Sequence, residues 1–325
     1  MTGKLRIMHV LPYHPLDSAS IFSKRQISDL GKLGHENKVF FLRARFNVLS
    51  LMSQFKEFKR QVEAFDPDII HAHYGTITAF FASCYRKKPF VVSFHGSDLN
   101  KKTNVNKFRN RVGRKLSTIA AKRAQLVFCV SESLRQQLEV KKEEAIVLPS
   151  GIDMEMFRPI DREACIDRLG LKAEVKYVFF NSNNPEIKRL DIATEAVSML
   201  TDLNVELLSL NGNVAPDEIP FYLNACRCLL LCSDNEGSPM VIKEAMACNL
   251  PTVAVNVGDV VERISEVSNS FVVQQDAGVI AAKIRQIVEQ NIERTNGRDA
   301  LISQNLDSMQ IIRIMEREYF RILGN

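Results

Sequence analysis

The sequence has no long hydrophobic run among its 325 residues. A long segment without charged residues, which begins at Ile69, contains two histidines, a glycine and threonines, and these are poor residues for a bilayer-spanning helix. The first apolar run, residues 7–11, is far too short for the core of a signal peptide and is interpreted as a strand. We therefore expect a cytoplasmic protein, attached at most peripherally to the inner face of the cell membrane.

Paired cysteines and a glycine-rich dinucleotide loop are also missing. The seven cysteines are odd in number and scattered, which fits reduced thiols. Cys226, Cys228 and Cys232 lack the C-x-x-C spacing of a metal site, so we interpret them as core thiols. No Gly-x-Gly-x-x-Gly is present, which leaves dinucleotide binding of that type without support. Asp66-Pro67-Asp68 matches an Asp-x-Asp metal motif, but its turn-forming chemistry is the preferred explanation.

Charge is distributed unevenly along the chain. Residues 1–150 carry 26 Lys and Arg against 12 Asp and Glu, a net charge of +14, while the remainder carries 17 against 26, or −9. This division indicates that only one domain meets a polyanion. In residues 101–123 apolar side chains recur at helical spacing, with Lys and Arg on the other face. That basic face is either simply solvated or contacts anionic lipid headgroups, and no nucleic-acid partner is expected.

Strand-like and helix-like segments alternate along the whole chain, which predicts parallel sheets with crossover helices. The length favours two domains, and a hydrophobic content of 46% is enough for two cores. We expect an α/β protein with two doubly wound, Rossmann-like domains and a ligand cleft between the carboxyl edges of their strands. The expected strands are residues 5–11, 38–42, 69–72, 90–93, 126–130, 145–148, 176–180, 205–210, 229–232, 252–254 and 270–273.

Residues 149–159 have turn-forming residues at both ends and no apolar periodicity, so they are interpreted as the connection between the domains. The expected organisation has four parts. They are an N-terminal Rossmann-like domain (1–149), a linker (150–160), a C-terminal Rossmann-like domain (161–308) and a last helix (309–325).

The most informative segment contains Glu236 and Glu244. An apolar run, predicted to be a buried strand, precedes it, and a helical pattern with proline in its first turn follows. Glu236, Gly237 and Ser238 therefore lie in a strand-to-helix turn, where free backbone N–H groups form an anion site with a carboxylate at its rim. Glu244 lies about a turn and a half further along the helix. Amides for a diphosphate and two carboxylates for sugar and ribose hydroxyls would together describe a nucleotide-sugar pocket.

This segment resembles the Glu-x7-Glu signature of the retaining GT-B glycosyltransferases of family four, also called glycosyl transferases group 1. The likeness extends to the flanking residues 219–225 and 250–259, and it is greatest to enzymes of teichuronic-acid and exopolysaccharide biosynthesis. It implies the GT-B fold, a nucleotide-diphosphate sugar as substrate rather than cofactor, and no metal ion. It also implies that residues 1–149 form the acceptor-side domain, that residues 161–308 form the nucleotide-sugar-binding domain, and that the last helix, 309–325, packs at the domain junction. It also implies donor contacts from Lys188, Arg189, Gly237, Ser238, Met240, Val241 and Glu244.

The same resemblance implies catalytic roles for His95, Asp98 and Glu236. His95 and Asp98 follow a predicted strand and resemble the family's His-Gly-x-Asp motif. This places His95 near the reacting face of the sugar, with Asp98 in support; considered alone, His95 would be interpreted as capping a strand. His71 and His73 alternate on one strand and point the same way. Packing in the core is the preferred explanation for them, ahead of a contact with the acceptor.

The chain departs from the family pattern in two places. Lys188 lies where a cation can hold a leaving diphosphate, but an asparagine-rich stretch replaces the family's preceding arginine and Arg189 replaces the following glycine. Either Arg189 supplies the second cation, or the asparagines and the backbone replace it. The Gly-Gly turn after the first strand is replaced by residues 17–22.

From these features we expect a metal-independent, hexosyl-type glycosyltransferase that transfers a sugar, with retention, to a hydroxyl of a lipid-linked or saccharide acceptor. The pathway would be cell-surface polysaccharide or glycolipid biosynthesis. No second carboxylate is placed as a nucleophile, so front-face attack by the acceptor is expected. The alternative is a non-catalytic GT-B subunit that binds a nucleotide sugar or a partner transferase. A GT-B epimerase would need acid and base residues that the sequence does not show.

Overall fold

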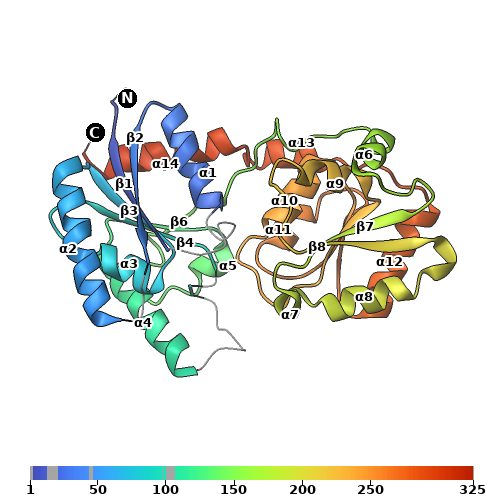
Figure 1. The fold of residues 1–325 in the computed structure, drawn as a ribbon, viewed down its shortest axis with the longest axis horizontal. Helices are drawn as coiled ribbons and strands as arrows, with labels where there is room; N and C mark the ends of the chain where they lie inside the picture. Colours follow the sequence, from blue (N-terminus) through green and yellow to red (C-terminus); the bar gives the residue numbers. More distant parts are fainter. Residues whose placement is uncertain (1–2, 13–20, 44–46, 97, 100–106, 325) are drawn as a thin grey trace. The chain divides into compact units, whose positions relative to one another are not determined.

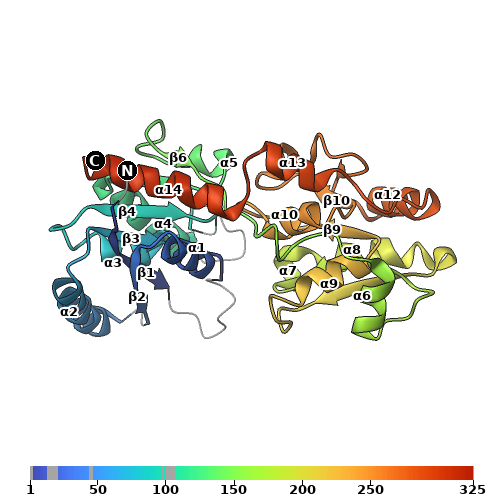
Figure 2. The same ribbon diagram turned by 90° about the horizontal axis from the view of Figure 1, so that it is seen from above.

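The computed structural model describes residues 3–12, 21–43, 47–96, 98–99 and 107–324. The chain forms two compact units: Met1–Ser150 with Ser308–Asn325, and Gly151–Asp307. Each unit contains one sheet whose strands are all parallel, with helices between the strands (Figure 1, Figure 2). The predicted class, an α/β chain of two Rossmann-like units, is therefore confirmed.

The first unit has a six-stranded sheet of order β2-β1-β3-β4-β5-β6. In this sheet β2 lies on one side of β1, and β3 with all later strands lies on the other side. The strand order therefore reverses between β1 and β3. The strands are β1 (Arg6–Pro12), β2 (Glu36–Leu42), β3 (Ile69–His73), β4 (Phe90–Phe94), β5 (Leu126–Cys129) and β6 (Ile146–Val147). The helices are α1 (Ile21–Lys32), α2 (Val48–Phe65), α3 (Thr76–Ala82), α4 (Lys107–Arg123), α5 (Glu132–Arg135) and α14 (Ser308–Ile322).

Side chains of the first sheet alternate between its two faces, and this alternation separates two environments. Ile70 of β3 packs with Phe58 of α2 in the main hydrophobic core. Its neighbour His71 points the other way, and the hydroxyl of Tyr319 in α14 lies 2.7 Å from His71 Nδ1. The last helix therefore belongs to the first unit, on the face of the sheet opposite α2.

The second unit has a five-stranded sheet of order β11-β10-β9-β7-β8. Its strand order reverses between β7 and β9, so the loops that follow these two strands flank the switch point where α/β proteins bind ligands. The strands are β7 (Lys176–Asn181), β8 (Val205–Leu210), β9 (Cys228–Leu231), β10 (Thr252–Val255) and β11 (Phe271–Val273). The helices are α6 (Arg162–Leu169), α7 (Pro185–Lys188), α8 (Leu190–Ser198), the 3-10 turn η2 (Thr201–Leu203), α9 (Ile219–Ala225), α10 (Met240–Ala247), α11 (Val260–Ile264), α12 (Ala277–Glu289) and α13 (Gly297–Ser303).

The connection after β6 is held by the second unit from Gly151 onward. Ile152 forms an isolated bridge with Asp307, and the guanidinium of Arg298 donates to the carbonyls of Met154 and Phe157 at 2.8 Å. Residues that the sequence marks as an irregular linker are thus bound to the unit that follows. Within the described ranges, no helix has the length and hydrophobicity that a bilayer crossing requires.

Two groups of possible metal ligands have structural roles. Asp66 ends α2 in a left-handed conformation and pairs with Lys88 at 2.7 Å, while Asp68 Oδ2 accepts the backbone N–H of Arg6 at 2.7 Å. This Asp-x-Asp match is explained by capping and turn contacts. The three cysteines of the α9–β9 region are fully buried, in keeping with core thiols: Cys226, Cys228 and Cys232.

Candidate functional site

The loops after β7 and β9 bring Lys188 and Glu236 into contact. Lys188 Nζ donates to Glu236 Oε1, and each side chain is 17% exposed. The backbone also joins the two loops, because Asp234 N–H donates to the Ile187 carbonyl at 2.9 Å. Two of the residues expected in the donor site therefore meet at the switch point of the second sheet.

Arg189, the neighbour of Lys188, has a φ of +57°, in the left-handed region that favours glycine. It occupies the position where the family pattern has glycine, and it adopts a backbone conformation that glycine favours. Its guanidinium bonds Asp191 at 2.8 Å and 3.0 Å and Asp234 at 3.3 Å. The charge of Arg189 is therefore balanced locally by two carboxylates.

Helix α10 begins at Met240 without a side-chain cap within the described part of the chain. The side chains of Met240 and Val241 are buried, so these residues can meet a ligand only through their backbone N–H groups. Glu244 lies further along the same helix and is half-buried. Uncapped N–H groups at a helix start form an anion site, and here they adjoin the loop that carries Glu236.

The loop after β10 packs directly on the turn that contains Gly237. Gly258 has a φ of +59°, and a Cβ at that position would lie 2.8 Å from the Gly237 carbonyl oxygen. Only glycine fits this close approach without a shift of one loop. The conformation of the candidate donor turn therefore depends on the loop after β10.

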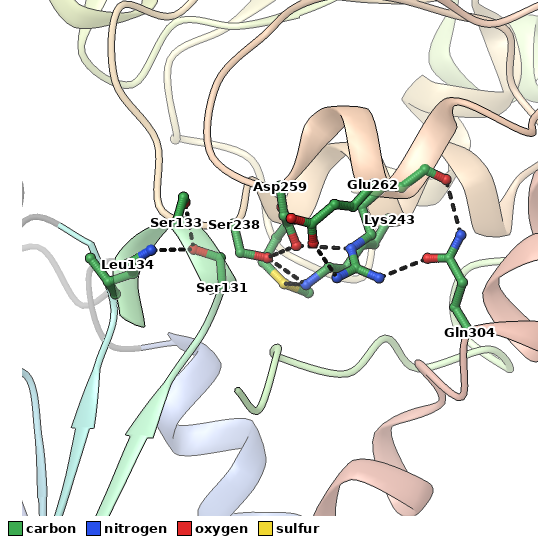
Figure 3. A network of polar contacts seen from close by, with 10 residues as sticks. Ser131, Ser133, Leu134, Ser238, Lys243, Asp259, Glu262 and Gln304 are labelled. Carbon is green, nitrogen blue, oxygen red and sulfur yellow. Dashed lines mark hydrogen bonds and ion pairs between the residues drawn. The ribbon is translucent and has the colours of Figure 1, made fainter. Parts of the chain in front are cut away.

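A buried polar network, which the sequence analysis missed, lies behind this turn (Figure 3). Lys243 is fully buried and donates to Ser238 Oγ at 2.8 Å, and the Ser238 hydroxyl donates to Asp259 Oδ2 at 2.8 Å. Arg263 Nε donates to the same Asp259 oxygen at 2.9 Å. Burial lowers the pKa of Lys243 to about 8, and the nearby Asp259 opposes this shift. The signal in the sequence was a lysine on the apolar face of a predicted helix.

This network changes the expected role of Ser238. Its hydroxyl accepts from Lys243 and donates to Asp259, so the side chain is used within the protein. A contact between Ser238 and a ligand would therefore use the backbone. The turn, rather than the hydroxyl, is the part of Ser238 that suits a diphosphate.

In the first unit, His95 directly follows β4 and is half-buried. Its ring packs against Tyr74, with 4.5 Å between ring centroids, and no described residue is a hydrogen-bond partner of the buried His95 Nε2. Burial lowers the pKa of His95, while Asp98 acts in the opposite direction. The imidazole is therefore neutral at pH 7 and has a ring nitrogen for which the described residues supply no partner.

Asp98 holds the backbone around His95. Its carboxylate accepts the N–H groups of Gly75 at 2.8 Å, Gly96 at 2.9 Å and His95 at 3.2 Å, and the side chain is buried. Asp98 thus supports His95 through the main chain. Ser97 lies outside the described residues. So do residues 17–20 of the segment 17–22, which replaces the family's Gly-Gly turn, while Ile21 and Phe22 begin α1.

His71 and His73 are fully buried, as predicted, and share their side of the sheet with His9. Ligand nitrogens of the three rings lie within 4.8 Å of one another, a spacing that could hold a metal ion. However, His9 Nδ1 and His73 Nε2 already form a 3.1 Å hydrogen bond, and both nitrogens of His71 are engaged by Ser93 and Tyr319. We therefore interpret these histidines as a hydrogen-bonded part of the core.

Comparison of the sequence with protein families and with known proteins identifies the family of this chain. The family model "Glycosyltransferase Family 4" matches residues 16–156, and the model "Glycosyl transferases group 1" matches residues 199–302. The chain belongs to the family 4 glycosyltransferases. TuaC of Bacillus subtilis, a glycosyltransferase by name, is 24% identical over 261 residues, and the match covers 72% of this chain. This chain spans only 65% of the length of TuaC.

Solved structures share the fold. A glycosyltransferase from Rickettsia africae ESF-5 has a TM-score of 0.78 at 17% identity, with full coverage of both chains. Anabaena HepE, solved in complex with UDP-glucose, has a TM-score of 0.76 at 19% identity, covering 97% of this chain and 99% of that one. At these identities the likeness concerns the fold of a family 4 glycosyltransferase alone.

The candidate residues are distributed over both family matches. His95 and Asp98 lie in the first matched region, and Glu236 and Glu244 lie in the second. Lys188 falls between the two regions, yet its contact with Glu236 connects it to the second. Each candidate residue thus lies in a loop or helix of its own unit: His95 and Asp98 in the first, and Lys188, Glu236 and Glu244 in the second.

Proposed function

We propose that this protein is a glycosyltransferase that transfers a sugar from a nucleotide-diphosphate donor to an acceptor hydroxyl. The observation that carries the proposal is the Lys188–Glu236 pair beside the uncapped start of α10, at the switch point of the second sheet. A nucleotide sugar offers a diphosphate and many hydroxyls. A lysine, helix N–H groups and carboxylates are the groups that bind them.

In this mechanism the second unit binds the donor. Lys188 leaves its contact with Glu236 and bonds a diphosphate oxygen, together with the N–H groups of Met240 and Val241. Glu236 accepts hydrogen bonds from hydroxyls of the donor sugar, and Glu244 accepts them from the ribose. Negative charge builds on the diphosphate as the glycosidic bond breaks, so these donors stabilise the transition state without a metal ion.

The reaction proposed is a transfer with retention. The bond from the anomeric carbon to the phosphate oxygen breaks while the bond to the acceptor oxygen forms on the same face. The acceptor proton passes to the departing diphosphate oxygen, which balances the step. His95 of the first unit, neutral at neutral pH, bonds a sugar hydroxyl while the anomeric carbon becomes cationic.

A hexose is the first donor sugar to test, because HepE was solved with UDP-glucose. The name of TuaC links that relative to teichuronic acid biosynthesis. By this likeness we propose a role in cell-surface polysaccharide or glycolipid biosynthesis, with a lipid-linked or saccharide acceptor.

We further propose peripheral attachment of the first unit to anionic membranes at the cytoplasmic face. Leu49 near the start of α2 is 78% exposed and Phe108 near the start of α4 is 76% exposed, with Arg111 and Lys115 exposed beside the latter. Both helices follow parallel strands, so their first turns share the carboxyl edge of the sheet. Exposed apolar residues beside cations are typical of surfaces that bind anionic lipids.

Vesicle co-sedimentation tests the attachment. Arg111→Glu with Lys115→Glu should weaken binding to anionic vesicles, since each cation near the surface contributes ~1 kcal/mol at low salt. The matched control is Lys172→Glu, at an exposed lysine of the second unit. Binding that did not depend on anionic lipid, or that survived the double reversal, would contradict the proposal.

Two measurements test the transferase function. A thermal-shift screen over UDP-, GDP-, ADP- and CMP-sugars should raise the melting temperature with one nucleotide class, because a ligand that binds only the native state stabilises it. Nucleotide release from that donor, in the presence of a lipid-linked acceptor, then separates a transferase from a non-catalytic subunit. Binding without release would favour the subunit, and no binding would contradict both.

A further inference from the structure

A buried polar cluster connects the candidate donor turn to the loop after β10 (Figure 3). It consists of Lys243, Ser238, Asp259 and Arg263, and we call it the Lys243 cluster. Lys243 and Asp259 are 0% and 1% exposed, and the Ser238 hydroxyl bridges them with two 2.8 Å hydrogen bonds. A single serine of the turn therefore contacts both a buried cation and a buried carboxylate.

The cluster contains two cations and one internal carboxylate. Arg263 bonds Asp259 at 2.9 Å and extends to the Gln304 side chain at 2.8 Å. Asp259 Oδ1 is buried, and no described residue is its hydrogen-bond partner. Glu262 reaches Arg263 only at 3.5 Å. Within the cluster itself the two cations outnumber the one carboxylate, which is the sign that favours an anion nearby. The half-buried Glu244 and the exposed Glu262 carry the opposing charge.

Packing alone does not account for a lysine at this position. Lys243 lies on α10 among fully buried apolar neighbours such as Ile242 and Met246. An aliphatic side chain of similar length would fill the space without the cost of burying a charge. What lysine adds is the bond to Ser238 and the positive charge beside Asp259.

We propose that Lys243 is a positioning residue of the donor site, which through Ser238 and Asp259 holds the Glu236–Gly237–Ser238 turn in the conformation that receives a nucleoside diphosphate. This inference rests on the proposed function of the same turn. Gly258 supplies the steric part of this arrangement, because it packs against Gly237. The Lys243 cluster supplies the polar part.

The test measures UDP binding by calorimetry, or binding of another nucleoside diphosphate if the donor screen selects it. Lys243→Met keeps the length of the side chain and removes its charge and hydrogen bond. It should raise the Kd for UDP by roughly tenfold or more, the effect of losing one hydrogen bond to a charged group. In turnover assays the rise should appear mainly in the donor KM.

Matched controls separate positioning from general loss of packing. Ile242→Val shortens a fully buried neighbour on the same helix and should leave the Kd unchanged. Asp259→Asn should weaken UDP binding as Lys243→Met does. The double variant should weaken binding by less than the two effects combined, because both act through Ser238.

A pH series gives a readout that a purely structural lysine would not move, and its wild-type part needs no variant. Between pH 7 and 9.5 the UDP phosphates no longer titrate, since their last proton leaves near pH ~6. As the pH passes about 8, Lys243 loses its charge beside Asp259, Arg263 and Glu244, the charged groups that act on it. The wild-type Kd should rise there, and the Kd of Lys243→Met should stay flat.

Three outcomes are decisive. A raised Kd in Lys243→Met, with the wild-type pH step, supports the inference. Wild-type binding of UDP that neither variant nor pH alters would overturn it and leave the transferase proposal standing. Failure of the wild type to bind any nucleoside diphosphate would overturn the proposed function, and this inference with it.

Discussion

Lys188 and Glu236 form an ion pair although 48 residues separate them in the sequence. The contact exists because β7 and β9 are neighbours in the sheet. The strand that follows β7 lies on one side of this pair, and the strand that follows β9 lies on the other side. The loops at their carboxyl ends therefore meet. Under the proposed function, a diphosphate would compete for the lysine, and the paired cation and carboxylate would become separate binding groups.

Removing either member of this pair should lower turnover while leaving the fold intact. Lys188→Ala and Glu236→Gln should each reduce kcat/KM by roughly a hundredfold, the effect of losing ~2–4 kcal/mol of transition-state stabilisation. As a control, Arg168→Ala breaks the exposed Arg168–Glu218 pair at 2.8 Å and should stay within a factor of a few of wild type. If both site variants behaved like this control, the site assignment would be wrong.

A second prediction concerns Gly258, for which the chain offers a close control. Gly258 and Gly170 have φ values of +59° and +63°, but only at Gly258 would a Cβ meet another loop. Each Gly→Ala change should cost about 1–2 kcal/mol of unfolding free energy through the left-handed backbone. Gly258→Ala alone should also weaken nucleotide binding, because its methyl group displaces the Gly237 peptide. Equal binding by the two variants would show that the turn tolerates the shift.

The sequence predicted the fold well because parallel strands that are buried on both faces appear as short apolar runs. All eleven predicted strands are present, and the expected strand 145–148 forms only Ile146–Val147. The connection between the units was harder to predict. Turn residues suggested a linker over 150–160, whereas Arg298, far along the chain, binds the carbonyls of Met154 and Phe157.

The candidate site could be predicted only where one segment defines it. The turn at Glu236 and the loop at His95 each follow a strand, so the sequence predicted that they lie at the edge of a sheet. The sequence did not predict the Lys243 cluster. Lys243 is connected to Asp259 through Ser238 only when the turn after β9 and the loop after β10 pack together. Likewise, the contact of Asp98 with the Gly75 N–H depends on the path of the loop after β3.

A third prediction follows from the buried histidines. Burial lowers the pKa of His9 from 6.5 to about 4, against the effect of its hydrogen bond to Asn37. Below pH 6.5 the unfolded chain therefore binds a proton that the folded chain does not, so stability falls as the pH falls toward 4. The pKa values of His71 and His73 are also lowered by burial, which adds to the same trend.

At pH 5 this term from His9 alone amounts to about 2 kcal/mol. His9→Gln can keep the hydrogen bond to Asn37 and cannot titrate, so its melting temperature should depend less steeply on pH between 7 and 5 than that of the wild type. Thermal melts of both proteins across this range check the effect. Parallel curves would mean that His9 is protonated in the folded protein.

The last prediction separates two residues of one motif. His95 is half-buried and contacts Tyr74 through its ring, whereas Asp98 is buried and accepts three backbone N–H groups. His95→Ala should therefore lower the free energy of unfolding by only about 1 kcal/mol, while transfer activity is largely lost. Asp98→Asn should cost about 2–3 kcal/mol, because its amide NH2 faces N–H donors.

Thermal melts and donor turnover, measured on both variants, decide between a catalytic and a structural histidine. Because burial lowers the pKa of His95, its ring stays neutral to a lower pH than an ordinary histidine does. If the neutral ring is what the reaction needs, wild-type kcat/KM should begin to fall only below pH 6.5, the ordinary histidine value. A His95→Ala protein that was stable and fully active would return this residue to a structural role, and the non-catalytic subunit would become the better description.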